Sequence, residues 1–581
     1  MNTLPQRIER AAQGDRTVTF VDGDDHVTLP WAQLHDEARA MAAALQQRGV
    51  VVGDHVALLG PTTRSLVTAI QATWLSGAVL VMLPLPMRMG SLEQFVAQTR
   101  ARIRAADVSM VLVDPQLAAF VEPTDGDPPF AGFAELEPPA SGVGSADFVA
   151  PSVDPDALAV LQFTSGSTSE PKGVMLTHRQ ICANVDGCYQ AAEMTDDDVV
   201  VSWLPLYHDM GLIGLLTIPM TSGCGLVQGA PQDFLGKPSR WMGWMSDFGG
   251  TITAGPNFSY VLATRSLRRA EDLDLSRVRI VLNGAEPVDA DAFRRFFAEG
   301  ERFGLRIDAA FPAFGMAELC IGGTFPRPGA GLCTDVVDGR VLEGEHYAAP
   351  VEPGAPNARE LVFLGRAVPG LQLRVVHPDT GELCADREVG ELQIRGTSLM
   401  AGYYRRPEES ADLLVDGWLR TGDLAYLVDG EMVMCGRIKD VIIIGGRNIY
   451  PQDVERAVGE VEGVRAGNVI AFGESGRYSK QHIVVVAETR VEDGAELVRE
   501  ISRAVTEEVG VPPRDVVLVP PGTVPKTSSG KLQRTACRKL FESGELGGTV
   551  AAPPVELVEP PAAGAPAAAP EPADEPVSRR P

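Results

Sequence analysis

The chain alternates up to about residue 310 between short apolar segments and longer amphipathic ones, and this alternation restricts the fold more than any other feature. Val56–Leu59 and Val79–Leu83 have the composition of buried strands, and a helical pattern separates them. The clearest helical spacing links Trp31, Leu34, Ala38, Met41 and Leu45, with Gly49 as a C-terminal stop. Alternation of strands and helices predicts an α/β fold built on a mostly parallel sheet.

Later regions have different patterns. Residues 122–156 are rich in Pro, Gly and Asp and are predicted to form a surface connection. Short alternating strands follow over about 360–435, with hairpin turns predicted at Asp379-Thr380-Gly381 and Asp429-Gly430. Residues 437–546 return to a mixed α/β pattern, with strands expected at Val469–Phe472 and Ile483–Glu488. The sequence predicts a large domain over 1–436 and a small one over 437–546.

The last segment, 547–581, is dominated by proline and alanine. Ordering each residue costs roughly 1–2 kcal/mol, and this segment has few bulky side chains to offset that cost. We therefore expect it to be disordered. A second local feature, Gly223 to Gly229, resembles a dinucleotide-binding fingerprint, but its third glycine is one residue late. It is interpreted as a tight turn.

Composition excludes several classes of function. A chain of 581 residues needs more than one core, and its net charge of −26 argues against nucleic acid as a partner. Its eight cysteines form no C-x-x-C pair, which disfavours zinc and redox sites and is typical of free thiols in a reducing cytosol. The N-terminus lacks an apolar signal sequence, and Leu212–Val227 is too short and broken to span a bilayer. A cytoplasmic protein that does not span a membrane is predicted.

A hydroxyl-rich loop follows the predicted strand Leu158–Phe163. Gly166 is surrounded by Thr164, Ser165, Ser167, Thr168 and Ser169, and Lys172 comes shortly after. Hydroxyls, free backbone N–H groups and an ammonium on a turn suit a polyphosphate. The loop differs from a Walker P-loop because Pro171 stands where the second glycine belongs and no Ser or Thr follows Lys172. A solvated Ser/Gly turn is the alternative.

Five further segments carry chemistry-bearing side chains in an order that becomes informative when they are taken together. They are Trp203–Gly211 with its His208, Asn283-Gly284-Ala285-Glu286-Pro287, Phe314-Gly315-Met316-Ala317-Glu318, Thr421-Gly422-Asp423, and Pro525–Lys531. The second could hold a purine edge by backbone groups, and the third combines an aromatic face with a metal-binding carboxylate. The fourth predicts a carboxylate on a turn, able to accept from ribose hydroxyls. Each segment alone fits an ordinary turn, and a lone histidine is more often structural.

In this order the segments resemble the adenylate-forming superfamily of acyl-CoA synthetases, peptide-synthetase adenylation domains and luciferases. The resemblance covers residues 10 to 545 and implies two mostly parallel αβ-layered sheets, a small β-barrel-like subdomain over about 360–435, and a small mobile α+β C-terminal domain. It implies ATP and Mg²⁺ as cofactors.

Residue by residue, the resemblance implies the following roles. The loop Thr164, Ser165, Gly166, Ser167 and Thr168, with Lys172, would bind the β and γ phosphates; Gly284, Ala285, Glu286, Gly315, Met316 and Ala317 would contact the nucleotide. Phe314 would stack on adenine, where the superfamily usually has Tyr. Glu318 would bind Mg²⁺, Asp423 the ribose and Arg437 the nucleotide. Lys531 would act in adenylation, His208 would lie near the carboxylate pocket, and Asp440 would be the hinge of the C-terminal domain.

Three details resemble the fatty acyl-AMP ligases within this superfamily. The sequence of Ser202–Leu216 is similar to the corresponding motif of that subfamily, and Ala317 stands where most of the superfamily has Thr. The separation of Glu318 from Gly365 is roughly double that expected of an acyl-CoA ligase. The extra stretch, 331–359, resembles the subfamily's insertion, which is thought to restrain the C-terminal domain and disfavour CoA. An ordinary surface loop is the alternative, because extra loop length costs little free energy.

The resemblance implies a fatty acyl-AMP ligase that activates a medium- or long-chain fatty acid, releases pyrophosphate and loads the acyl group onto an acyl carrier protein. No carrier domain is recognised in the chain, so the carrier is expected in trans. An acyl-CoA ligase is one rival. The other is a nucleotide or acyl sensor that keeps the fold without catalysis.

Overall fold

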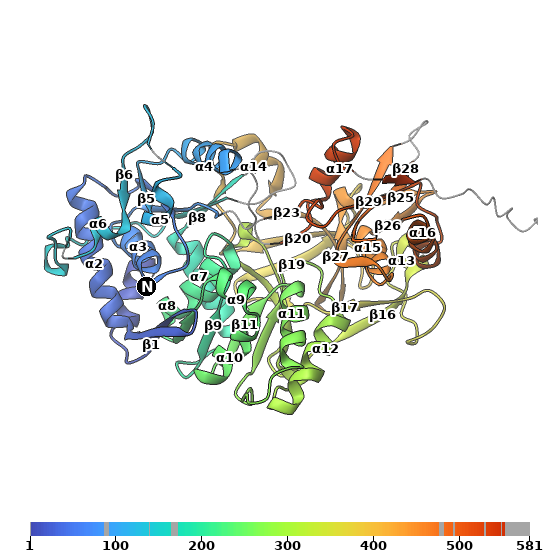
Figure 1. Cartoon of the computed structure of the whole chain (residues 1–581), viewed down its shortest axis with the longest axis horizontal. Helices are drawn as coiled ribbons and strands as arrows, with labels where there is room; N and C mark the ends of the chain where they lie inside the picture. Colours follow the sequence, from blue (N-terminus) through green and yellow to red (C-terminus); the bar gives the residue numbers. More distant parts are fainter. Residues whose placement is uncertain are drawn as a thin grey trace, which may run out of the picture.

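The computed structural model describes residues 2–85, 92–121, 123–138, 140–163, 172–475, 481–491, 494–527, 530–547 and 549–551. Figure 1 shows a large body that runs from blue through green to yellow, with the orange and red C-terminal elements on its right-hand side. The hydroxyl-rich loop Thr164–Thr168 lies outside the described residues.

Sheet A contains seven strands in the order β13-β12-β11-β9-β10-β1-β2. They are β1 (Thr17–Asp22), β2 (Asp25–Pro30), β9 (Val199–Ser202), β10 (Gly225–Gln228), β11 (Ile252–Gly255), β12 (Ile280–Asn283) and β13 (Ala310–Pro312). Every pairing is parallel except the β1–β2 hairpin at one edge. The carboxyl ends of the parallel strands therefore all lie at the same end of the sheet.

Sheet B also contains seven strands, in the order β21-β8-β7-β4-β3-β5-β6. They are β3 (His55–Leu59), β4 (Val79–Met82), β5 (Met110–Val113), β6 (Phe130–Gly132), β7 (Leu158–Phe163), β8 (Gly173–Thr177) and β21 (Gly402–Tyr403). The central pairings are parallel, whereas β8 and β21 add antiparallel strands at one side. Strand β21 comes from far along the chain and so joins the β-rich region to this sheet.

Helices cover the sheets, and the apolar strands are buried on both faces. The longer helices are α1 (Leu4–Ala11), α2 (Trp31–Gln47), α3 (Arg64–Leu75), α4 (Leu92–Ala105), α7 (His178–Ala191), η2 (Met210–Thr217), α10 (Ser239–Asp247), α11 (Asn257–Leu267) and α12 (Ala290–Gly300), and the short ones include α5 (Pro115–Ala118), α6 (Phe133–Leu136), α8 (Ile218–Ser222) and α9 (Pro231–Gly236). In β3, Val56 and Leu58 belong to one apolar core, and Ala57 and Leu59 to another. Burial on both faces explains why these strands are apolar without alternation.

The β-rich region forms an antiparallel sheet next to a small excursion. Its strands are β19 (Leu371–Val376), β20 (Gly390–Gly396), β22 (Leu414–Val415), β23 (Trp418–Val428) and β24 (Glu431–Arg437), followed along the chain by η6 (Ile438–Asp440), and α14 (Pro407–Leu413) lies between β21 and β22 in sequence. A smaller sheet contains β14 (Phe314–Gly315), β15 (Gly322–Phe325) and β18 (Arg366–Ala367). The excursion consists of β16 (Thr334–Asp338), α13 (Gly339–Glu345) and β17 (Ala358–Val362).

The C-terminal region is α+β. It contains β25 (Ile442–Ile444), β26 (Arg447–Ile449), α15 (Pro451–Gly459), β27 (Val464–Ser475), β28 (Gln481–Thr489), α16 (Ala495–Val509), β29 (Asp515–Val519), α17 (Arg534–Glu542) and β30 (Thr549–Ala551). Strands β27 to β30 form one mixed sheet, and each of its faces has an apolar cluster of its own. The predicted fold class is confirmed: two mainly parallel sheets, a curled β subdomain and a small α+β C-terminal domain.

Three local predictions were wrong. The segment Gly223–Gly229 is not a tight turn, because its residues 225–228 form β10, a buried interior strand of sheet A. Residues 130–132, inside the predicted surface connection, pair with β5 as the edge strand β6. Residues 549–551, within the segment expected to be disordered, pair with β29, since backbone hydrogen bonding at a sheet edge requires no bulky side chain. Residues 552–581 lie outside the described residues.

No helix among the described residues is long and apolar enough to cross a bilayer.

Candidate active site

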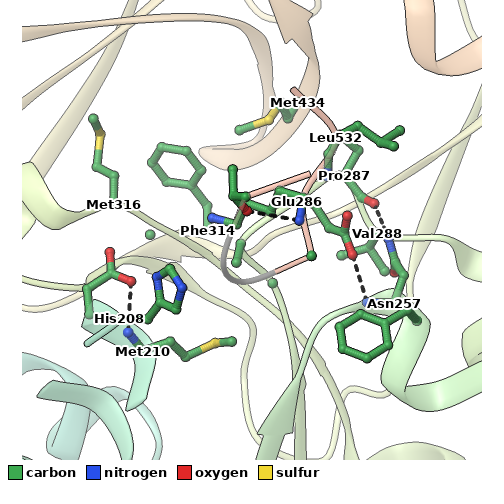
Figure 2. A pocket seen from close by; sticks show the side chains of 18 of the residues that line it. His208, Met210, Asn257, Glu286, Pro287, Val288, Phe314, Met316, Met434 and Leu532 are labelled. Carbon is green, nitrogen blue, oxygen red and sulfur yellow. Dashed lines mark hydrogen bonds between the residues drawn. The ribbon is translucent and has the colours of Figure 1, made fainter. Parts of the chain in front are cut away.

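A cavity of about 2660 Å³ lies between the large body and the C-terminal domain, at the carboxyl ends of the sheet A strands. Figure 2 shows residues from distant parts of the chain lining it, including His208, Glu286, Phe314, Met434 and Leu532. Of the residue groups predicted from the sequence, all those that the structure describes line this cavity. It therefore brings five sequence-distant segments into one space.

The turn after β12 is held in a strained conformation. Ala285 has a φ of +72°, which is uncommon for a residue with a side chain. A Cβ on Gly284 would lie 2.8 Å from the carbonyl oxygen of Ala313, so the two strand ends approach closely only with glycine there. Glu286 accepts a hydrogen bond from the Asn257 backbone N–H at 2.9 Å (Figure 2). Burial raises the pKa of Glu286, and that N–H opposes the shift.

Phe314 to Glu318 form the adjacent wall of the cavity. Phe314 is buried in β14, and a Cβ on Gly315 would overlap the Ile321 carbonyl oxygen, which explains the glycine. The Glu318 carboxylate accepts a hydrogen bond from the Tyr403 hydroxyl at 2.7 Å. Burial raises the pKa of Glu318, while the Tyr403 bond acts in the opposite direction. The wall thus presents an aromatic ring and a carboxylate within one short segment.

Asp423 and Arg437 form the wall contributed by the β-rich region. Asp423 was expected on a turn, but it lies within β23, where Gly422 has a φ of +70° and the pairing shifts register just beyond. Its side chain is only 4% exposed, and its carboxylate accepts from Arg437 Nε of β24 at 2.7 Å. Burial raises the pKa of Asp423 despite this partner. The kink at glycine allows a strand residue to face the cavity.

His208 lies on the loop between β9 and η2. Its backbone is fixed at both ends, because its N–H donates to the Pro205 carbonyl at 3.2 Å and its carbonyl accepts from Leu212 N at 2.8 Å. Burial, with a smaller contribution from the charge on Lys531, lowers the pKa of His208 to about 3. The imidazole is therefore neutral near pH 7.

Lys531 reaches the cavity from the C-terminal domain. Its carbonyl accepts from Thr527 N at 2.8 Å, and its N–H donates to Thr527 Oγ1 at 3.0 Å, which closes the end of its loop. The charge of Lys531 acts on both His208 and Glu286, so the loop is directed into the cleft. A Cβ on Gly530 would lie 3.4 Å from the Phe258 ring of the large body. The predicted hinge residue Asp440 lies at the end of η6 and pairs with Arg534 at 3.2 Å.

Lys172 is the described end of the predicted phosphate loop. Its ammonium pairs with Glu409 at 2.5 Å and lies 4.9 Å from the centre of the Tyr403 ring. Neither Tyr403 nor Glu409 was predicted as a site residue. Tyr403 lies on β21, which pairs with β8 directly after Lys172, and a local pattern does not reveal a partner so distant in sequence.

One branch of the cavity is apolar and was not predicted. Val200, Ile252 and Ile280 are paired across β9, β11 and β12 and form one row. Ala254 and Leu282 form the next row toward the strand ends, and Leu282 remains half-buried although it belongs to an interior strand. All five line the cavity. From Ile280 to the polar turn at residue 284 the strand rises roughly 13 Å.

A polar network occupies the amino ends of the same strands, one or two residues before the apolar row, and its side chains do not line the cavity. Arg279 donates to Asp198 Oδ1 at 2.7 Å and to the Ala192 carbonyl at 2.9 Å. Asp198 also accepts from Thr251 Oγ1 at 2.7 Å. Ala192 and Met194 line the cavity beside this network. The branch therefore has apolar walls, and the polar network lies outside its lining.

The excursion β16–α13–β17 lies against the C-terminal domain (Figure 1). Glu343 of α13 forms an ion pair with Arg447 of β26. Arg359 of β17 pairs with Asp453 of α15 at 3.0 Å and lies 4.6 Å from the centre of the Tyr450 ring. The expected insertion is thus a packed contact with the C-terminal domain.

Comparison with known proteins agrees with this geometry. The model of the AMP-binding enzyme family matches residues 8–404, and that of the AMP-binding enzyme C-terminal domain matches residues 446–538. This chain belongs to the AMP-binding enzymes. It is an ATP-using, adenylate-forming ligase.

The names of individual relatives describe different ligase activities. A Mycobacterium tuberculosis protein named only as a ligase is 39% identical over 541 residues, covering 90% of this chain and 98% of its own. A medium-chain-fatty-acid–[acyl-carrier-protein] ligase of Moorena producens is 33% identical, covering 89% and 90%. An acyl-CoA synthetase of Caulobacter vibrioides is 32% identical, covering 94% and 96%.

Among solved structures, one from a study of fatty acyl-adenylate ligases of E. coli and L. pneumophila superposes with a TM-score of 0.86 at 30% identity, covering 93% of this chain and 98% of that one.

Proposed function

We propose that this enzyme converts a medium- or long-chain fatty acid and ATP into acyl-AMP and pyrophosphate, and then transfers the acyl group to the phosphopantetheine thiol of an acyl carrier protein supplied in trans. The apolar branch carries the proposal, because it is continuous with the cavity lined by Lys531 and His208. An alkyl chain would fill the branch while its carboxylate stays among the polar groups at the strand ends. A chain longer than the branch would have to displace the strand ends where Asp198 and Arg279 are paired to each other, which would disfavour it.

The nucleotide would occupy the opposite side of the cavity. Phe314 would stack on the adenine, Asp423 would accept from the ribose hydroxyls, and Gly284 with Ala285 would approach the base by backbone groups. Arg437 pairs with Asp423 and would add positive charge near the phosphates. We propose that Lys172 and the loop Thr164–Thr168 bind the outer phosphates.

Glu318 fits the Mg²⁺ that this chemistry requires. In the described part of the chain, no three His, Cys, Asp or Glu side chains gather into a metal site of their own. Mg²⁺ is commonly held by one or two carboxylates together with substrate phosphates, and a half-buried carboxylate facing the cavity suits that mode. When bound, the ion would neutralise charge on the phosphates.

The chain's own residues would perform the adenylation step by positioning and by charge. A fatty carboxylate must approach the α-phosphorus although both groups are anionic. Lys531 would offset that repulsion, and His208, neutral near pH 7, would offer the carboxylate at most one ring N–H without adding a charge. The bond from a carboxylate oxygen to the α-phosphorus forms as the bond to pyrophosphate breaks.

The excursion β16–α13–β17, which packs against the C-terminal domain, supports a carrier protein rather than CoA as the acceptor of the acyl group. Arg359 and Glu343 hold the C-terminal domain on one side, which would restrict the rotation that opens the cleft to small thiols. An acyl-CoA ligase remains the second candidate, favoured by the name of the Caulobacter relative. A sensor without catalysis is disfavoured by the shared placement of Lys531, Glu318 and Asp423 around one cavity.

The decisive experiment offers ATP, Mg²⁺ and acids of graded chain length to the enzyme, with CoA or a holo carrier protein as acceptor. Mass spectrometry should detect acyl-AMP for medium or long acids and acyl carrier protein as the main thioester. Efficient acyl-CoA formation would replace this proposal by the CoA ligase, and absence of pyrophosphate release with every acid would favour the sensor.

A further inference from the structure

Residues 398–404, here called the bridging segment, lie between β20 and α14 and contact the segment that carries Glu318. The backbone N–H of Met400 donates to the Glu318 carbonyl at 2.8 Å. The Ser398 carbonyl accepts from the Cys320 thiol at 3.5 Å, two residues beyond Glu318. The bridging segment thus fixes the main chain of the Glu318 segment at two points.

The same segment also contacts the strand that begins just after Lys172. Its β21 pairs with β8, with Tyr403 opposite Val174, and the Tyr404 N–H donates to the Gly173 carbonyl at 2.8 Å. Gly173 is the residue next to Lys172 in the chain. Seven residues therefore join two segments that lie far apart in sequence.

The side chain of Tyr403 makes both contacts at once. It is only 6% exposed. Its hydroxyl donates to Glu318 Oε1 at 2.7 Å, and the ammonium of Lys172 lies 4.9 Å from the centre of its ring. One hydrogen bond leaves acceptor capacity on a carboxylate, which has two oxygens and about four lone-pair positions. Glu318 can therefore keep this bond and still face a cation in the cavity.

A tyrosine that only satisfies its own hydroxyl in the core is the simpler interpretation. Two observations argue against it. The acceptor is a cavity-lining carboxylate, and the ring contacts an ammonium that also faces the cavity. Phenylalanine would keep the contact between ring and cation and lose the bond to Glu318, whereas leucine would lose both. The two functions of the side chain can thus be separated experimentally.

We propose that Tyr403 is a positioning residue that couples Glu318 to Lys172, so that Mg²⁺ and the outer phosphates of ATP meet a carboxylate and an ammonium held at a fixed spacing. This inference rests on the proposed roles of Glu318 and Lys172. Partners that orient a metal-binding carboxylate typically contribute a factor of about 10–100 in metal affinity or activity. Tyr403 does not touch the reacting atoms in this assignment.

The test compares Tyr403→Phe and Tyr403→Leu with Tyr404→Phe. The adjacent Tyr404 is a matched control, because its hydroxyl bonds to Asp107 at 3.3 Å on the exposed side, away from Glu318. Two measurements are needed: pyrophosphate release against MgCl₂ concentration with decanoic acid as substrate, and calorimetric binding of ATP without fatty acid, with and without MgCl₂. Thermal melting checks that each variant is folded.

Tyr403→Phe should raise the MgCl₂ concentration for half-maximal pyrophosphate release about 10-fold, and should weaken ATP binding only when MgCl₂ is present. Its KM for decanoic acid should stay unchanged. Tyr403→Leu should in addition weaken ATP binding without MgCl₂, because Lys172 loses its ring contact. Tyr404→Phe should match the wild type in both measurements.

Either of two results would overturn the inference. In the first, the Tyr403→Phe enzyme matches Tyr404→Phe. In the second, its ATP binding weakens equally with and without MgCl₂. A wild-type enzyme that releases no pyrophosphate with any fatty acid would contradict the proposed function instead. The calorimetric comparison would still decide the role of Tyr403 in that case.

Discussion

The C-terminal domain meets the large body through two surfaces of different character. In one of them, Arg359, Asp453 and Tyr450 form a packed contact in which charge and ring are buried together, although Arg359 and Asp453 also line the cavity. The other is the open part of the cavity, into which Lys531 reaches from its loop. The packed side resists separation, whereas the open side leaves room for ligands. A domain anchored on one side and open on the other can alter its contact with the active site at modest free-energy cost.

Removing Lys531 tests the open side and should have the largest effect. Lys531→Ala deletes the cation that is proposed to offset charge during adenylation. By analogy with the loss of one preorganised donor, the rate should fall at least about 10²–10³-fold, roughly 3–4 kcal/mol. Transfer from pre-made acyl-AMP should be much less affected if Lys531 leaves the site for that step. Single-turnover assays of each half-reaction measure this, and equal loss in both would contradict a role confined to adenylation.

Breaking the buried ion pair tests the packed side. Arg359→Met leaves Asp453 buried without a cation, and such a loss commonly costs about 3–5 kcal/mol. Raising an open state from 1% to 50% requires only about 2.7 kcal/mol, so CoA thioester should appear where little formed before. The measurement is acyl-CoA formation at matched adenylation rates.

Two further variants control this prediction. Arg359→Met combined with Asp453→Leu should restore the restraint in part, because two apolar side chains can replace a buried ion pair. Arg294→Met removes an exposed pair with Glu360 on the large body and should leave the acceptor preference unchanged. Unaltered CoA use by the Arg359 single variant would show that this contact does not restrain the domain.

A substitution in the apolar branch should have a smaller effect. Ala254→Phe places a ring in the row next to Leu282, and overpacking of this kind typically costs about 1–3 kcal/mol. The preferred acid should become shorter, with the KM for ATP unchanged. Adenylation rates across acids of graded length measure the shift, and an unchanged length profile would place the acyl chain elsewhere.

Truncation after Ala551 should have the smallest effect. Residues 552–581 carry little apolar surface to pack against either side of the C-terminal domain. Melting temperature and adenylation rate should equal those of the full chain. A lowered melting temperature would show that the segment docks. A shorter chain lacking β30 as well should be less stable, because it exposes the edge of β29.

Elements that are marked by a short stretch of sequence could be predicted from the sequence alone. Buried strands such as Leu158–Phe163 were predicted from short apolar runs, and the predicted site residues share one cavity where the structure describes them. Each of those segments contains its chemistry-bearing side chains within a few residues, but it becomes informative only in the order of the whole set. The alternation of strands and helices predicted the α/β class, and the family resemblance added the arrangement in two sheets.

The features that the sequence did not predict depend on contacts between residues that are distant along the chain. Tyr403 and Glu318 are separated by 85 positions, and no local pattern pairs them. Glycines flank the short apolar run of β10 and favour a turn in the sequence, although burial in sheet A makes this run a strand. The apolar branch is likewise assembled from three separate strands, each apolar for reasons of ordinary core packing. Whether a cavity lies beside these apolar residues depends on the assembled fold and cannot be seen in the sequence.

Arg534 connects the expected hinge of the C-terminal domain to the segment that carries Lys531. It pairs with Asp440 at the expected hinge and with Glu455 of α15 at 2.6 Å, and it lies three residues after Lys531. The guanidinium of Arg534 thereby joins the expected hinge to α15, and the chain runs from Arg534 back to Lys531 within three residues. A small change in backbone angle at residue 440 would sweep the lysine through a long arc without deforming the loop that carries it. The enzyme would then withdraw its catalytic charge by rotation alone, with no local unfolding.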